Sequence, residues 1–147
     1  MKEIKFRAWD KMLCEMFEVY TLSKYEVYAI QQETEDMYKL NLSDCELMQF
    51  TGLKDKNGVE IYEGDIVRWG LGFTGSWDNE SWHRYAVAEL FPSLQFRIIY
   101  YIIGETGEKK ETDNHVFEFG SFAYKETHKY LEVIGNIYQN PELLESK

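Results

Sequence analysis

The chain of 147 residues is long enough to form one domain with its own core. Hydrophobic residues make up 44% of it and charged residues 29%, which excludes a disordered chain, and an aromatic content of 16% favours β-strands. The formal net charge of −10, with no basic run longer than Lys109-Lys110, argues against direct binding to a phosphate backbone.

The first 50 residues are typical of short strands. "KEIKFRAW" alternates between an apolar and a charged face, and its apolar face holds Ile4, Phe6 and Ala8. A turn follows at Asp10-Lys11. Residues 12–20 fit either a second strand or a short helix. Residues 24–50 alternate in short pieces around the polar run 31–36, which we interpret as a hairpin loop.

The next stretch, "FTGLKDKNGVEIYEGDIVRW" (50–69), contains two turn signals. Asn57-Gly58 predicts a type I′ hairpin turn. Gly64 suits a left-handed backbone conformation, and Asp65 is placed to accept hydrogen bonds from nearby backbone N–H groups. Between the turns, Ile61 and Tyr62 are expected in the core, and "DIVRW" reads as a strand.

The second half of the chain continues with strand-like segments at 82–90 and 95–103, separated from further strands by a solvated loop at 104–114. Near the end, Asn140 as N-cap and Pro141 at the first helical position predict a short C-terminal helix. This spacing of short strands favours an all-β barrel or sandwich over a parallel α/β sheet.

A glycine-rich segment beyond Trp69 carries the candidate binding residues. "GLGFTG" matches a dinucleotide fingerprint, but no helical pattern follows it, so we interpret it as a loop. Aromatic side chains on such a loop can stack on a partner, although packing against the fold is the alternative. The candidate partner-binding residues are Trp69, Phe73, Trp77 and Trp82.

Three neighbouring carboxylates, Glu60, Glu63 and Asp65, pose the question of acid–base or magnesium chemistry. Turn formation explains them without a substrate, and the sequence contains no catalytic motif. Cys14 and Cys45 have neither disulfide-framework nor zinc-site spacing. We therefore expect no enzyme activity, no cofactor and no catalytic or metal-binding residues, while a metal at the three carboxylates stays an open question.

Three blocks of the sequence resemble the YopX protein family: "IKFRAWD" (4–10), "MQFTGLKDKNGVEIYEGDIV" (48–67) and "EVIGNIYQNPELL" (132–144). The resemblance spans nearly the whole chain. It implies a small bacteriophage or prophage protein without an established activity, and a mostly β fold with an SH3-like, partly open barrel. We expect a single domain over 1–147, with additional N-terminal strands in 1–47 and the barrel-forming part in 48–140.

The leading functional hypothesis is a non-enzymatic accessory protein that binds another protein or itself. The alternatives are a nucleic-acid-binding small β-barrel, an acidic DNA mimic and a metal-dependent hydrolase. The sequence has no signal-peptide pattern and no apolar run near the ~20 residues of a membrane span, so we expect a cytoplasmic protein and no membrane. The family resemblance implies that this is the cytoplasm of a bacterial host.

Overall fold

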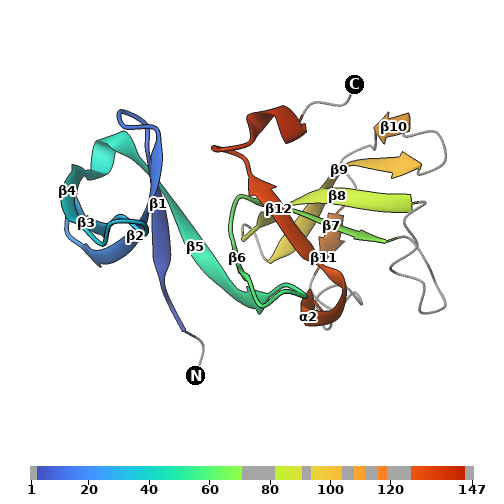
Figure 1. The fold of residues 1–147 in the computed structure, drawn as a ribbon, viewed down its shortest axis with the longest axis horizontal. Helices are drawn as coiled ribbons and strands as arrows, with labels where there is room; N and C mark the ends of the chain where they lie inside the picture. The colour runs from blue at the N-terminus through green and yellow to red at the C-terminus, as the bar shows by residue number, and fades with distance from the viewer. Residues whose placement is uncertain are drawn as a thin grey trace. The chain divides into compact units, whose positions relative to one another are not determined.

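The computed structural model describes residues 3–70, 82–90, 94–103, 108–111, 116–118 and 127–144. It divides the chain into two compact units, Met1–Phe50 and Thr51–Lys147 (Figure 1). Among the described residues, no helix has the length and apolar character needed to cross a membrane.

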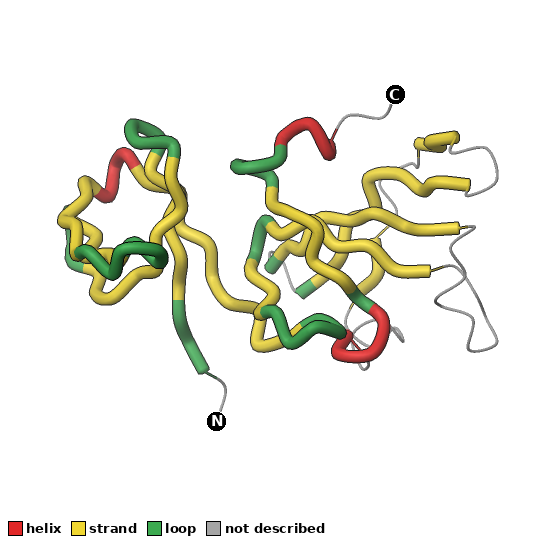
Figure 2. The backbone as a smooth tube through the Cα atoms, in the orientation of Figure 1, coloured by secondary structure: helices red, strands yellow, loops and turns green. Residues whose placement is uncertain are grey.

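The N-terminal unit is an antiparallel sheet in the order β4-β3-β2-β1-β5, with a 3-10 turn, η1, before the last strand. Figure 2 shows the backbone of this unit bending round on itself. Its core therefore draws on every strand, with Ala8, Phe17, Val27, Ala29 and Leu40 buried and Leu47 packed against them. The elements are β1 (Phe6–Asp10), β2 (Glu15–Leu22), β3 (Glu26–Ile30), β4 (Met37–Asn41), η1 (Leu42–Asp44) and β5 (Cys45–Lys54).

The second unit begins within β5, whose last part pairs with β6 (Glu60–Tyr62). Its main sheet has the order β10-β9-β8-β7-β12, and β11 pairs with β9. The remaining elements are β7 (Asp65–Gly70), β8 (Trp82–Glu89), β9 (Gln95–Ile103), β10 (Glu108–Glu111), β11 (Val116–Glu118), α2 (Thr127–Tyr130), β12 (Glu132–Asn136) and η2 (Pro141–Leu144).

The core of the second unit lies on β7, β8 and β9. Ile66 and Val67 are adjacent in β7 and both fully buried, so this strand is covered on both faces. Ala86, Ala88, Phe96 and Ile98 belong to the same core cluster as Val67. The last strand, β12, pairs antiparallel with β7 although 60 residues or more separate their paired positions, as in Glu132↔Arg68.

The prediction of a mainly β protein is confirmed. Residues 12–20 belong largely to a strand, β2, and the polar run 31–36 joins β3 to β4 as a hairpin, with Ile30 opposite Met37. The SH3-like barrel is not confirmed by these strand pairings.

The predicted C-terminal helix is wrong, because Pro141–Leu144 forms only the 3-10 turn η2. The side chain of Asn140, the expected N-cap, makes a different hydrogen bond: its Oδ1 accepts the backbone N–H of Asn136 at 3.2 Å. A helix this short also adds too few backbone hydrogen bonds to offset the cost of its nucleation.

Candidate functional site

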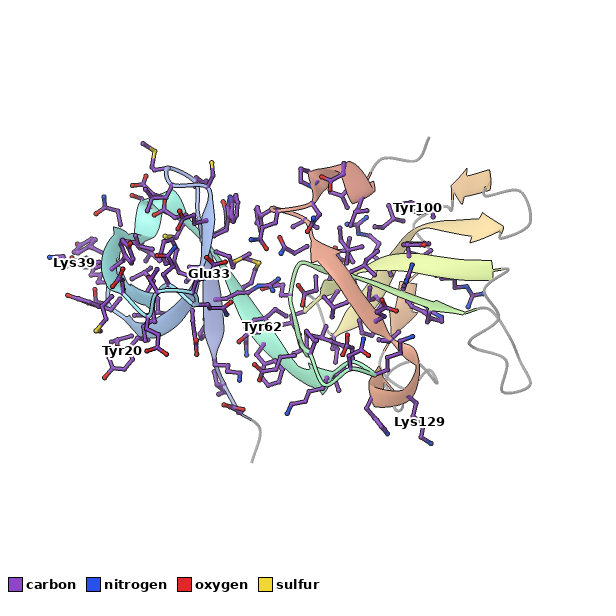
Figure 3. All side chains as sticks on the ribbon, in the orientation of Figure 1. Tyr20, Glu33, Lys39, Tyr62, Tyr100 and Lys129 are labelled. Atoms are coloured by element: carbon purple, nitrogen blue, oxygen red, sulfur yellow. The ribbon has the colours of Figure 1, made fainter. Side chains whose placement is uncertain are left out.

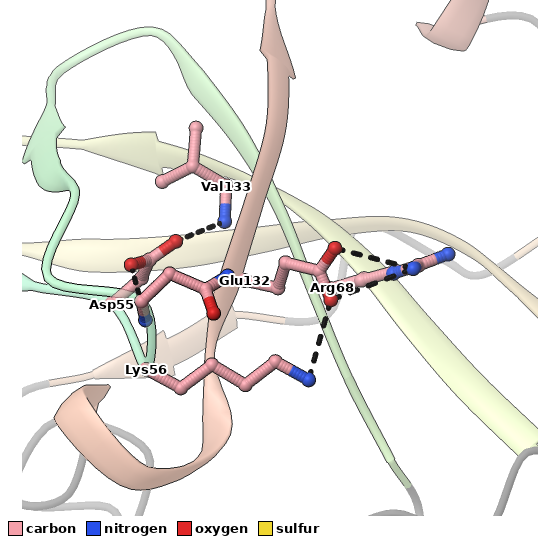
Figure 4. A network of polar contacts seen from close by, with 6 residues as sticks. Asp55, Lys56, Arg68, Glu132 and Val133 are labelled. Carbon is pink, nitrogen blue, oxygen red and sulfur yellow. Dashed lines mark hydrogen bonds and ion pairs between the residues drawn. The ribbon is translucent and has the colours of Figure 1, made fainter.

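The Asp55 carboxylate joins two sequence blocks that lie far apart in the chain (Figure 4). Asp55 is 2% exposed, and its Oδ1 accepts the backbone N–H groups of Asn57 and Val59, both at 2.8 Å. Its Oδ2 accepts the N–H of Val133 in β12 at 2.9 Å. The N–H of Lys56 donates to the carbonyl of Leu131 at 2.8 Å. This turn therefore satisfies backbone groups at the edge of β12 that would otherwise lack a strand partner.

The turn itself differs from the type I′ turn predicted at Asn57-Gly58. The N–H of Gly58 donates to the carbonyl of Asp55 at 3.0 Å, so Lys56 and Asn57 are the two central residues. Among the described non-glycine residues, only Cys14 and Glu35 have positive φ, whereas Gly58 has φ +80°. The Asp55 carboxylate holds the N–H of Asn57, which favours a turn followed by one left-handed glycine over a type I′ turn.

Beside this turn, the Glu132 carboxylate forms ion pairs with two cationic side chains (Figure 4). Its carboxylate lies 3.3 Å from Lys56 Nζ and 3.3 Å from Arg68 Nη2. Burial disfavours the charged form of Arg68, but a hydrogen bond with Tyr85 and the charge of Glu132 outweigh it and raise the guanidinium pKa. All three groups of the ion-pair network are about a third exposed, so it contributes on the order of 1 kcal/mol or less.

A second polar turn follows β12. Asn136 Oδ1 accepts the N–H groups of Tyr138 and Gln139, at 3.0 and 2.8 Å. A Cβ on Gly135 would lie 2.5 Å from Asn140 Oδ1, so only glycine allows this close approach. The polar residues of the blocks 48–67 and 132–144 therefore stabilise turns and strand edges, which is a structural role.

The three neighbouring carboxylates do not converge on a common point in the way that their spacing suggests. Asp65 is 1% exposed, and its Oδ2 accepts the N–H of Tyr62 at 2.7 Å, as predicted. Gly64 has the predicted left-handed conformation, with φ +86°. Ile61 is fully buried, as predicted, whereas Tyr62 is only partly buried. Glu60 and Glu63 are both partly buried and have polar or electrostatic partners of their own. Within the described ranges, no group of three or more His, Cys, Asp or Glu side chains could hold a metal ion.

The four aromatic candidates have different positions. Trp69 is 1% exposed in the core of the second unit, with its ring edge-on to Phe96 at a centroid distance of 6.2 Å. Phe73 and Trp77 lie outside the described residues. Trp82 begins β8, but its side chain also lies outside them. The structure therefore gives Trp69 a packing role, and a partner-binding role for the other three stays a prediction.

Exposed apolar side chains are concentrated in the N-terminal unit. Of the ten large apolar side chains exposed among the described residues, only Val59 and Leu144 belong to the second unit. Tyr20 is 67% exposed and Met37 65% exposed. The other six are Ile4, Met12, Leu13, Leu22, Tyr25 and Tyr38.

Two of these eight side chains, Tyr20 and Met37, lie on the outer face of β2, β3 and β4. Val27 and Ala29 point into the core, so Tyr28 and Ile30, which alternate with them, point outward and are partly exposed. Ile30 lies opposite both Glu18 and Met37. Figure 3 shows Tyr20 and Lys39 projecting away from the ribbon of this unit. We define the outer face as Glu18, Tyr20, Glu26, Tyr28, Ile30, Met37 and Lys39.

The sequence analysis missed this outer face, although the sequence contains a signal for it. In "EVYAI" (26–30), apolar residues occupy both phases of the strand alternation, so one set must face away from the core. An antiparallel sheet with one solvated face normally alternates apolar with polar residues. Apolar residues in both phases therefore indicate a second apolar face.

The comparisons with known proteins agree with the family blocks. A family model described as "YopX protein" matches residues 5–145. The fold is similar to the crystal structure of protein EF1440 from Enterococcus faecalis, with 28% sequence identity and a TM-score of 0.52. That similarity covers 99% of this chain and 100% of the other. No curated protein sequence matches the chain.

Proposed function

Since the chain belongs to the YopX protein family, we propose that it is a non-enzymatic accessory protein of a bacteriophage or prophage that binds another protein in the bacterial cytoplasm. Two of the family blocks support a non-enzymatic role. Their carboxylates and amides, at Asp55, Glu132 and Asn136, bind backbone N–H groups or neighbouring side chains of this chain. Residues used in this way stabilise the fold of the second unit.

The observation that carries the proposal is the apolar outer face of the N-terminal sheet. Exposed apolar side chains that occur singly are normal, but several of them side by side mark an interaction surface. Tyr and Met are also among the residues enriched at protein–protein interfaces. The outer face brings together Tyr20, Tyr28, Ile30 and Met37 from three adjacent strands.

The test is co-purification from phage-infected or prophage-carrying host cells with two matched double variants. Tyr20→Ser with Met37→Ser removes the two most exposed apolar side chains of the outer face, and Val59→Ser with Leu144→Ser removes the two of the second unit. We expect the first variant to lose a bound protein and the second to retain it. Light scattering of the purified chain would report self-assembly, the other form of the hypothesis. An outer-face variant with unchanged partners and unchanged mass would contradict the proposal.

The nucleic-acid-binding, DNA-mimic and hydrolase alternatives remain predictions. Gel shifts at low salt address the first of them, because phosphate contacts are strongest there.

A further inference from the structure

The outer face of the N-terminal sheet combines apolar side chains with charged ones. One cross-strand row runs from Arg7 in β1 through Glu18 and Ile30 to Met37, so the Glu18 carboxylate lies between a guanidinium group and an apolar side chain. Lys39 is the one basic residue of the outer face as defined above, and its Nζ lies 3.0 Å from Glu26. The hydrogen bond with Glu26 raises the pKa of Lys39. This ammonium group is therefore already engaged within the chain.

The loop between β3 and β4 adds three more carboxylates at the end of this hairpin. Glu33, Glu35 and Asp36 are exposed, and among the described residues their side chains form no ion pair. The loop directly precedes Met37, which brings these charges next to the apolar row.

Gln31 holds this loop in place. Its backbone N–H donates to the carbonyl of Asp36 at 3.0 Å, and its Nε2 donates to Glu15 Oε2 at 3.3 Å. Its Oε1 accepts the hydroxyl groups of Thr34, at 3.0 Å, and Tyr38, at 3.3 Å. These hydrogen bonds support the backbone of the loop that carries the three carboxylates.

Charge selects among the possible occupants of this apolar face. Residues 3–50 contain ten acidic and five basic residues, so a second copy docked face to face would meet like charge. A phosphate backbone would be repelled in the same way. A positively charged protein segment gains both apolar burial and electrostatic attraction.

We propose that the outer face binds a cationic segment of a partner protein in which lysine or arginine side chains flank apolar ones. This inference rests on the proposed function and specifies the chemistry of the partner. The apolar groups of the segment cover Ile30 and Met37, while its cations lie near the loop carboxylates.

Methionine-methyl NMR of the full chain tests the inference directly. The probe is a short synthetic peptide in which lysine and leucine alternate, and the comparison peptide has glutamate in place of lysine. We expect the lysine peptide to shift the methyl resonance of Met37 but not that of Met48, which is 2% exposed and serves as an internal reference. Binding should weaken between about 0.1 M and about 1 M salt, because the Debye length falls from about 10 Å to about 3 Å.

A charge-removing variant provides the second measurement. Glu33→Gln, Glu35→Gln and Asp36→Asn together should weaken binding of the lysine peptide roughly 10-fold, as expected for three exposed carboxylates. Glu142→Gln removes an exposed carboxylate of the second unit and should leave the affinity unchanged. These side chains have no role in the core, so the triple variant should retain the fold, and an unchanged Met48 methyl resonance would verify this.

Three results would overturn the inference: equal binding of the two peptides, no shift of Met37, or a triple variant with wild-type affinity. A Met37 shift that depends on protein concentration without peptide would identify a second copy as the occupant instead. Equal binding of both peptides would leave the proposed function standing, since an apolar surface without charge selectivity still binds protein. The proposed function fails separately, if the Tyr20 and Met37 variant retains every partner.

Discussion

The substitution Asp55→Asn tests whether the polar turn at the start of the second unit holds the fold. The amide oxygen can still accept the N–H groups of Asn57 and Val59, but Nδ2 then faces the N–H of Val133, 2.9 Å away in the wild type. Two donors oppose each other, and a charge-assisted hydrogen bond at a buried carboxylate is lost. We expect a loss of about 3 kcal/mol in the free energy of unfolding of the second unit.

Urea unfolding followed by NMR measures this loss. The indole N–H signal of Trp69 reports on the core of the second unit, and that of Trp9 follows the N-terminal unit separately. With a denaturant dependence of about 1.5 kcal/mol/M, a 3 kcal/mol loss lowers the midpoint of the Trp69 transition by about 2 M urea.

A matched variant, Glu142→Gln, makes the same carboxylate-to-amide change at an exposed position of the same unit and should alter stability by less than about 0.5 kcal/mol. If Asp55→Asn is as stable as Glu142→Gln, the structural role of Asp55 is refuted, and its carboxylate becomes a candidate for binding or catalysis.

Two further pairs of measurements test local features. Gly135→Ala should cost about 2 kcal/mol, because its Cβ would lie 2.5 Å from Asn140 Oδ1, whereas Gly58→Ala should cost about 1 kcal/mol from its φ of +80° alone, since no atom lies within 4 Å of its Cβ position. Equal costs in urea unfolding would contradict the close approach at Gly135. Burial, with the nearby charges of acidic residues, raises the pKa of the Cys45 thiol to about 11, so at pH 8 a thiol reagent should modify exposed Cys14 much faster. Because folding raises this pKa, Cys45 contributes stability at pH values below its unfolded pKa, and this contribution is lost as the pH rises towards 11. The Cys45→Ala variant should show neither the slow labelling phase nor this loss of stability at high pH.

Much of the fold could be predicted because strand formation leaves a local pattern. Alternation identified the strands around Phe6 and Val27, a continuous apolar segment identified the one around Ile98, and glycine identified the left-handed positions at Gly58 and Gly64. Residues two to four apart decide these features. The prediction of a helix at Pro141 failed because the Asn140 side chain accepts the backbone N–H of Asn136, four residues earlier, and therefore does not act as the N-cap.

Local sequence patterns are enough to predict that this protein is rich in β-strands, which family it resembles, and where most of its turns lie. The contact of Asp55 with the N–H of Val133, 78 positions further along the chain, and the packing of Trp69 in a core are visible only in the folded chain. The same holds for the position of Ile30 beside Met37 on an outer face. Strand pairing and burial depend on residues that the whole fold brings together. Alternation along one strand does not identify the residues of the strand that pairs with it.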